Sequence, residues 1–364
     1  MKTAIVEPRQ FFIWTFGLTV GTSVLVIPSS LAMTAREDAW IAALVGTTIN
    51  LLMVLLYVVI SRQYPGMSWF EIMEAALGKW LGKLAGGFYL FYFLILAGTL
   101  LGNLGFFLTS EILTETPIEA IQLLFLAAVV FAARLGIAAF ARVGELLFPW
   151  IVFFSLSLIL ALLPQTEWTY IQPMLEDGWG PALQAGFHSA MFQELVVLMV
   201  FLPLTKQSAQ TARHYFQAAG LGGLLLTSIV MLSVLVLGIE QAANSTFPAY
   251  ALAKTISLGD FIQRTEGVLI ALWILSFFVK TMLLVFAQLQ GLQSLFGLRS
   301  YHHLIYPLAA LILIVAWNTY LDSIYVAEII QKVWANYSFV HLVAFPFLIL
   351  VVGAFRGKRR RRVT

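Results

Sequence analysis

Two interrupted apolar stretches decide the fold, and the first is Phe11–Ala32, FFIWTFGLTVGTSVLVIPSSLA. It is long enough to cross a membrane, yet small or polar residues lie inside it at Gly17, Gly21-Thr22-Ser23 and Pro28. The second is Pro181–Pro203, PALQAGFHSAMFQELVVLMVFLP, which is interrupted in the same way. Broken spans at corresponding positions of two halves of a chain predict a binding site near the middle of the membrane in a transporter-like fold.

Composition predicts that most of the chain is immersed in lipid. Hydrophobic residues make up 60% of the 364 residues and charged residues 11%, with a mean hydropathy of +0.90. Soluble domains carry about 25% charged residues. Ten apolar segments approach the length of a membrane span, and we expect them at Phe11–Ala32, Ala39–Ser61, Leu84–Thr109, Ile118–Ala133, Leu146–Leu163, Pro181–Leu204, Phe216–Gly238, Val268–Leu292, Leu304–Trp317 and Ser338–Phe355.

These segments predict a single all-α membrane domain without a soluble catalytic module. Five spans fall in a first repeat, at about residues 1–163, and five in a second, at about 181–355, followed by a basic tail at 356–364. Helices one and six are the broken ones. We expect the first span to be retained, since no cleavage pattern of small residues follows it. The absence of cysteine excludes disulfides and thiolate metal sites.

Charge distribution predicts the orientation. With ten spans both termini lie on one side, and most of the 21 Lys and Arg residues fall on that side. The positive-inside rule therefore predicts cytoplasmic termini. The run from Arg356 to Arg362 is interpreted as an anchor facing anionic lipid rather than a nucleic-acid site, because no aromatic or structured basic face accompanies it.

The break in the first span supplies the first candidate site residues, Gly21, Thr22 and Ser23. A half-helix running onward from Ser23 presents free N–H groups and a positive dipole end, which attract a carboxylate. Gly17 and Gly21, four residues apart, are also typical of close helix packing. Both interpretations stay open.

Two charged residues lie deep inside spans. Glu194 is costly there unless it is paired, hydrated or protonated, so it is either a ligand-binding or proton-linked acid or a structural acid bonded to freed backbone N–H groups. Lys280 replaces a bound cation by its own charge, pairs with Glu194, or extends toward an interface. Its neighbour Thr281 bonds either a ligand or its own helix.

Other polar or aromatic residues in the spans are weaker candidates. Tyr92 is deep enough to cover a pocket, although core packing also explains it. Tyr89 either covers a pocket or, because it lies nearer the predicted inner end, belongs to the interfacial aromatic belt. For Asn103 we expect a hydrogen bond to another helix.

Nothing in the sequence indicates an enzyme, a cofactor or a metal site. The acidic residues Glu111, Glu115 and Glu119 are interpreted as a solvated helix end, because Pro117 breaks the helix between them. His302-His303 has no suitably spaced third ligand. No motif for phosphate binding or nucleophilic catalysis is present.

Several local strings, in order along the chain, resemble the B subunits of the nutrient germinant receptors of endospore-forming bacteria. They are Glu7-Pro8-Arg9-Gln10, Gly21-Thr22-Ser23, Ile27-Pro28, Asp38-Ala39-Trp40, Thr246 to Ala253, Gly259 to Arg264 with Glu266, and Trp273-Ile274. Each string is weak alone, but their order, the length and the span count also match.

The resemblance implies the fold of the amino acid–polyamine–organocation superfamily (LeuT-like), with two inverted five-helix repeats. It also implies sensing of a nutrient such as an amino acid in the inner membrane of the spore, with A-type and lipoprotein C-type partner subunits. Carried over residue by residue, the family pocket falls on Gly21, Thr22 and Ser23, then Phe192, Gln193 and Glu194, and Lys280 with Thr281. The outer loop from Glu240 to Glu266, with Phe247-Pro248 and Leu258–Ile262, is a lid, a partner-docking surface or a plain amphipathic loop.

The leading hypothesis is a sensing subunit that binds its ligand between spans one, three, six and eight. The backbone from Gly21 to Ser23 would hold a carboxylate, and Glu194 or a neighbouring acceptor an amine. The rival is a proton-coupled amino-acid transporter with Glu194 as proton carrier. A third possibility is an assembly subunit that binds no ligand.

Overall fold

The computed structural model describes residues 6–205, 209–256, 266–319 and 333–361, of which 356–361 are described by backbone only. Regular structure in these ranges is helical, apart from one isolated bridge between Val6 and Thr205. The α-helices are α1 (Pro8–Val20), α2 (Ser23–Ala35), α3 (Ala39–Gln63), α4 (Trp69–Leu77), α5 (Lys79–Glu111), α6 (Ile118–Leu135), α7 (Ile137–Leu162), α8 (Trp179–Ala190), α9 (Ala209–Leu237), α10 (Ile239–Asn244), α11 (Pro248–Lys254), α12 (Glu266–Phe296), α13 (Ile305–Trp317), α15 (Trp334–Phe339) and α16 (Phe345–Arg361). Short 3₁₀ turns are η1 (Arg36–Asp38), η2 (Leu163–Gln165), η3 (Trp168–Ile171), η4 (Leu195–Val200), η5 (Leu202–Leu204) and η7 (His302–Leu304), and η9 (Val340–Ala344) is a π-helical turn.

The chain is an integral membrane protein, as its composition predicts. Eight helical runs in the described ranges are long and apolar enough to cross a membrane, and the helical run His302–Trp317 is shorter. One of the eight, Ser23–Gln63, joins the second half of the predicted first span to the predicted second span. The total of ten spans stays a prediction.

The predicted breaks in spans one and six are both present. Helix α1 ends at Val20 and α2 begins at Ser23, so Gly21-Thr22 forms the first break. Helix α8 ends at Ala190, and the chain resumes at Leu195 as the 3₁₀ turn η4 rather than as an α-helix. Four residues of irregular backbone therefore lie inside the protein at the second break, where lipid cannot reach them.

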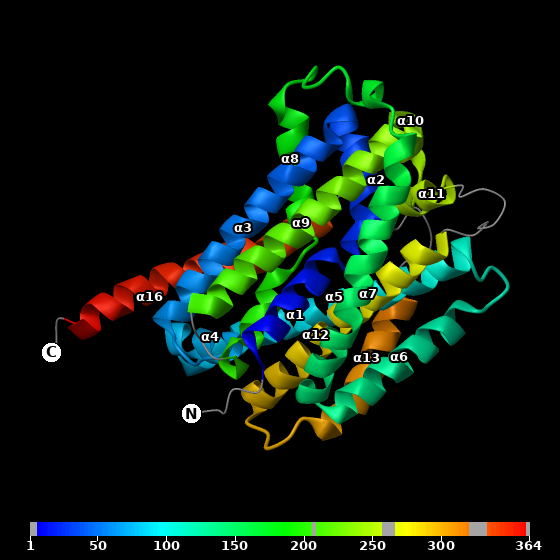
Figure 1. Ribbon diagram of the computed structural model, residues 1–364. Coiled ribbons are helices and arrows are strands. Elements are labelled where there is room, and N and C mark those ends of the chain that lie inside the picture. The colour runs from blue at the N-terminus through cyan, green and yellow to red at the C-terminus, as the bar shows by residue number, and fades with distance from the viewer. Residues whose placement is uncertain (1–5, 206–208, 257–265, 320–332, 362–364) are drawn as a thin grey trace.

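The two broken spans share α3 and α12 as neighbours: α2 and α8 pack against α3, whereas α1 and η4 pack against α12. Helix α1 lies against α9, α7 and α12, and α3 packs against α8 and α9, as the ribbon shows for α1, α3 and α9 (Figure 1). A Cβ added at Gly17 would lie 2.7 Å from Cγ1 of Val279, and one at Gly186 would lie 2.7 Å from the carbonyl oxygen of Ala42. Glycine at these positions lets the helix backbones approach closely. Gly17 is thus a packing residue.

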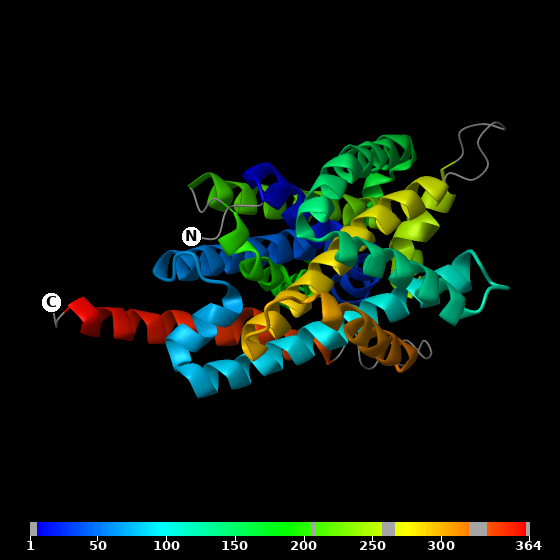
Figure 2. The same cartoon turned by 90° about the horizontal axis from the view of Figure 1, so that it is seen from below.

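Seen from below, α5 and α13 lie side by side, with α16 at one side of the molecule (Figure 2). The last span is irregular: the π-helical turn η9 frees backbone carbonyls, and buried tyrosines donate to them. The Tyr89 hydroxyl bonds the carbonyl of His341 at 2.5 Å, and the Tyr57 hydroxyl that of Leu342 at 2.7 Å. The interfacial interpretation of Tyr89 was therefore wrong, since its side chain is 1% exposed.

The outer loop carries α10 and α11 and covers the end of α5. Phe247 packs edge-on against Phe107 with ring centroids 4.9 Å apart, and Lys254 lies 3.4 Å from the Glu111 carboxylate. Helix α11 also contacts α2, α9 and α12. This part of the loop is a packed cover, whereas the predicted segment Leu258–Ile262 lies outside the described residues.

Candidate functional site

The site is centred on Lys280, a lysine of α12 whose side chain has no exposed surface. Its Nζ lies 2.7 Å from Oε2 of Glu194, which is equally buried. The contact is an ion pair and not an aligned hydrogen bond, because Oε2 has no partner of good hydrogen-bond geometry. Of the alternatives open for Lys280, the structure therefore shows the pair with Glu194 and not an extension to the membrane interface.

The same ammonium group joins both broken spans. It donates to Oγ1 of Thr22 at 3.1 Å and to the backbone carbonyl of Phe192 at 3.1 Å. Two of the three N–H donors of the ammonium are used in these bonds, and the charge of the group is balanced by the ion pair with Glu194. Lys280 thus acts as a built-in cation that satisfies a carbonyl freed by the second break and fixes three separate elements to one another.

The backbone at Glu194 is in an unusual conformation. Its φ of 42° and ψ of 39° place it in the left-handed region, which costs a residue with a Cβ about 1–2 kcal/mol. Such conformations persist where the surroundings determine them, and they cluster at ligand sites and switches. Here the left-handed turn directs the carboxylate toward Lys280 and ends the irregular segment before η4.

Gly21 is required by the path of the lysine side chain. A Cβ at this position would lie 2.6 Å from Cδ of Lys280, closer than a methyl group can approach. The glycine of the first break gives the lysine stem room, which agrees with the close-packing interpretation, and its threonine accepts from the ammonium. Binding of a carboxylate by the N–H groups of this break stays a prediction. Ser23 starts α2 as predicted, and its buried hydroxyl has no hydrogen-bond partner within the described ranges.

A small cavity of about 30 Å³ lies beside this ion pair, and we call it the central cavity. It is lined by Thr22, Val26, Leu96, Thr99, Leu100, Asn103, Phe192, Glu194 and Trp334. Pockets that hold drug-sized ligands measure about 300–1,000 Å³. The site is therefore nearly closed in this conformation, and a ligand larger than a few atoms requires the walls to move apart.

Three of the predicted site residues line the central cavity: Thr22, Phe192 and Glu194. Gln193 does not, although its side chain is 1% exposed and its Oε1 has no hydrogen-bond partner in the described part of the chain. The hydroxyl of Thr281 bonds the carbonyl of Phe277 at 2.9 Å, within its own helix. Of the two roles predicted for Thr281, the structure therefore shows the bond to its own helix, and its hydroxyl is not directed at the ion pair.

Tyr92 lies outside the lining of the central cavity, in an aromatic cluster behind it. Its ring stacks on His341 with centroids 4.3 Å apart and on Trp334 at 6.0 Å. Its hydroxyl bonds Oγ of Ser338 at 3.1 Å. Tyr92 therefore supports the wall that Trp334 forms and does not itself cover the cavity.

Three polar residues of the lining were not among the predicted site residues: Thr99, Asn103 and Trp334. The expected interhelical hydrogen bond of Asn103 is absent, because neither amide atom has a partner in the part of the chain that the structure describes. The sequence signal that could have identified Asn103 as a site residue was its position deep within an apolar span. Trp334 precedes the predicted last span, which starts at Ser338. Its place in the lining of the central cavity depends on the packing of helices and has no local signal in the sequence.

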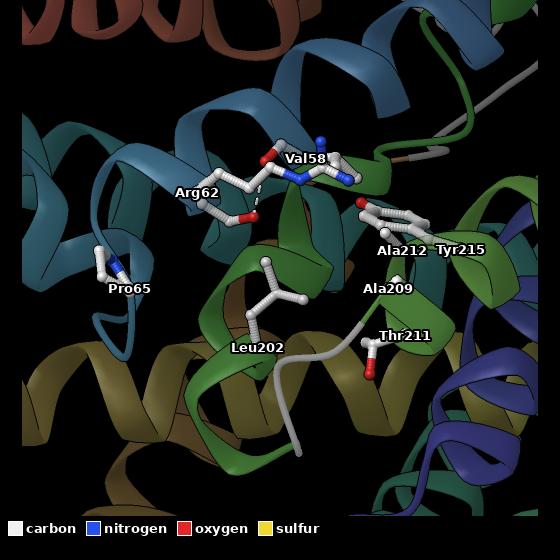
Figure 3. A pocket seen from close by; sticks show the side chains of 9 residues that line it. Val58, Arg62, Pro65, Leu202, Ala209, Thr211, Ala212 and Tyr215 are labelled. Carbon is white, nitrogen blue, oxygen red and sulfur yellow. Dashed lines mark hydrogen bonds between the residues drawn. The ribbon is translucent and has the colours of Figure 1, made fainter.

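A second, larger hollow of about 400 Å³ lies where α3 ends and α9 begins (Figure 3). Its walls include Val58, Leu202, Ala212 and Tyr215, with Arg62 as its charged residue. None of the predicted site residues lines it. We therefore take the central cavity as the candidate site.

The arrangement of helices is that of known transporters. The structure of Mhp1, a nucleobase–cation–symport-1 family transporter in a closed conformation with bromovinylhydantoin bound, aligns with a TM-score of 0.73 and 14% identity, covering 95% of this chain and 77% of that chain. MhsT in complex with L-phenylalanine aligns with a TM-score of 0.62 and 15% identity, covering 95% and 87%. These likenesses confirm the predicted LeuT-like fold.

Similar sequences point to a narrower group. Spore germination protein KB of Bacillus subtilis (strain 168) is 28% identical, covering 100% of this chain and 98% of that protein. Spore germination protein A2 of the same organism is 24% identical over 95% of this chain and 93% of that protein. A family model described as "Spore germination protein" matches residues 5–323. By this match, and with the fold and broken spans described above, the chain belongs to the spore germination protein family.

Proposed function

We propose that this protein is the nutrient-sensing membrane subunit of a spore germinant receptor and binds a small nutrient in the central cavity. One observation carries the proposal: a single buried ammonium, that of Lys280, joins the breaks of both interrupted spans directly beside a cavity whose lining combines polar and apolar side chains. Membership of the spore germination protein family indicates the process, germination, and the contacts of Lys280 indicate how ligand binding moves the broken spans.

The response follows from the elements that meet at the site. A ligand in the central cavity touches Thr22 on one broken span and Phe192 and Glu194 on the other, all three of which contact Lys280. To enlarge the cavity, these groups must move relative to the lysine. A ligand that binds the enlarged form more tightly shifts the population toward it by its difference in affinity. The changed positions of α2 and η4 would then be the signal.

We also propose the orientation of the protein, its membrane and the partner subunits that receive the signal. We place both termini in the cytoplasm, from the excess of Lys and Arg on their side. We further infer location in the inner membrane of the spore, together with A-type and lipoprotein C-type partner subunits. These partners would read the position of the broken spans.

The test replaces Gly21 by leucine, which fills the space taken by the Lys280 stem. We expect Gly21→Leu spores, in which this receptor is the sole one present, to lose the nutrient response while the protein keeps its normal membrane level. Gly87→Leu is the matched control, because Gly87 lies on an exposed part of α5 with nothing within 4 Å of an added Cβ. A normal dose–response curve for Gly21→Leu at normal protein level would refute the pocket.

Sensing and transport share this pocket, and flux separates them. Labelled solute flux and equilibrium binding are to be measured on the same proteoliposomes. Binding without flux agrees with a sensing subunit. Saturable flux that depends on the proton gradient, and that Glu194→Gln uncouples from it, would instead establish a proton-coupled transporter.

A further inference from the structure

The charges of the central cavity already balance each other. Glu194 and Lys280 lie 2.7 Å apart with side chains 2% and 0% exposed, and the other lining residues are uncharged. A zwitterionic amino acid brings an ammonium and a carboxylate, and each needs an opposite charge when it leaves water. Both opposite charges are engaged with each other, so a zwitterion has to break this ion pair, whereas an uncharged ligand leaves it intact.

The unused hydrogen-bonding capacity of the cavity lies in neutral groups. Asn103 is 2% exposed and lines the cavity, and neither its Nδ2 donor nor its Oδ1 acceptor has a partner among the described residues. The indole Nε1 of Trp334, in the same lining, is a buried donor that faces the Glu194 carboxylate but makes no hydrogen bond of good geometry among the described residues. Buried polar groups are normally hydrogen-bonded, so these atoms mark where a ligand's complementary groups belong.

The remaining wall is apolar and is formed by Val26, Leu96 and Leu100 with the ring of Phe192. An amide side chain offers a donor and an acceptor side by side, which matches a hydroxyl or a carboxamide. Sites in which a few polar groups fix orientation against an apolar wall are typical of small-molecule pockets.

We propose that the nutrient recognised here is an uncharged solute with hydroxyl or carboxamide groups, bound by Asn103 and the Trp334 indole, and not a zwitterionic amino acid. The inference rests on the proposed function, because it assigns the ligand class of that same cavity. It also makes Asn103 a specificity-determining residue.

The test separates nutrients by charge. Yeast extract is passed over a mixed bed of cation and anion exchangers. The unretained fraction holds uncharged solutes, and the retained fraction, after elution and desalting, holds amino acids, organic acids and amines. Both are applied to spores in which this receptor is the sole one present. We expect germination in the unretained fraction only. Periodate, which cleaves neighbouring hydroxyls but not carboxamides, then distinguishes a polyol from an amide.

The other possible germination results distinguish failure of the inference from failure of the proposed function. A response to the retained fraction, alone or in addition, overturns the inference and leaves the proposed function standing. No response to the unfractionated extract overturns the proposed function itself and the inference with it.

A matched pair of variants tests Asn103 directly. Asn103→Leu removes both the donor and the acceptor, and we expect the half-maximal concentration of the unretained fraction to rise about 10- to 100-fold. The control is Asn50→Leu in α3: Asn50 is also fully buried with both amide atoms unpartnered, but it does not line the central cavity. An unchanged half-maximal concentration in Asn103→Leu, at equal membrane level, would remove Asn103 from the site.

Discussion

Removal of the buried charge of Lys280 should be among the most costly single changes in this protein. Lys280→Met keeps an unbranched stem but ends one atom short of Nζ, and it leaves Glu194 buried without its counter-charge. It also deprives Thr22 and the Phe192 carbonyl of their donor. Loss of one partner of a buried ion pair costs about 3–5 kcal/mol, so we expect a loss of that order in the free energy of unfolding.

The partner variant and the double variant complete the measurement. Glu194→Gln alone leaves the ammonium uncompensated and should cost a similar amount. In Lys280→Met/Glu194→Gln no charge is left unpaired, so the double variant should be more stable than the sum of the single changes predicts. Replacement of a buried pair by neutral groups is often close to neutral, and a coupling energy of about 3 kcal/mol is therefore expected.

The assay is equilibrium unfolding of the purified protein in mixed micelles by titration with sodium dodecyl sulfate, followed by tryptophan fluorescence. The same titration is run on all four proteins at one lipid-to-detergent ratio. Additive effects of the two single changes, within about 0.5 kcal/mol, would refute the reasoning, because groups that do not interact show additive effects.

Two further predictions concern positions away from the ion pair. Tyr57→Phe leaves the Leu342 carbonyl in the π-helical turn without its buried donor, and we expect a loss of about 1–3 kcal/mol in the same unfolding assay; a loss below about 0.3 kcal/mol would show that this carbonyl needs no partner. Lys254→Ala removes the ion pair with Glu111, but the lysine side chain is 50% exposed, so the loss should stay below about 1 kcal/mol. A larger loss would mean that the cover formed by α11 depends on this ion pair.

The sequence predicted the general organisation because its main signals are local. Membrane immersion follows from apolar runs, and the breaks follow from Gly21-Thr22 and from the polar residues before Glu194. A polar or flexible residue inside a span has few structural solutions in lipid, and a broken helix within the protein is one of them. The structure has both breaks where the sequence indicates them.

The local pattern left open what each polar side chain contacts. Thr281 is beside Lys280 in the chain, yet its hydroxyl bonds its own helix while the ammonium of Lys280 joins two other elements. One interpretation of Tyr89 placed it at the interface from its distance to the span end, but the π-helical turn of the last span supplies a buried acceptor for its hydroxyl. A π-helical turn leaves no clear mark in a sequence.

What the sequence alone determined is a membrane-embedded helical protein with two broken spans and one acid and one lysine deep inside it. Only the tertiary structure decided that Glu194 and Lys280 neutralise each other, and that Asn103 and Trp334 face the same cavity. The physical reason is distance along the chain. Periodicity and composition report on the environment of a residue within about one helical turn, whereas a site formed by five separate segments depends on the relative placement of helices.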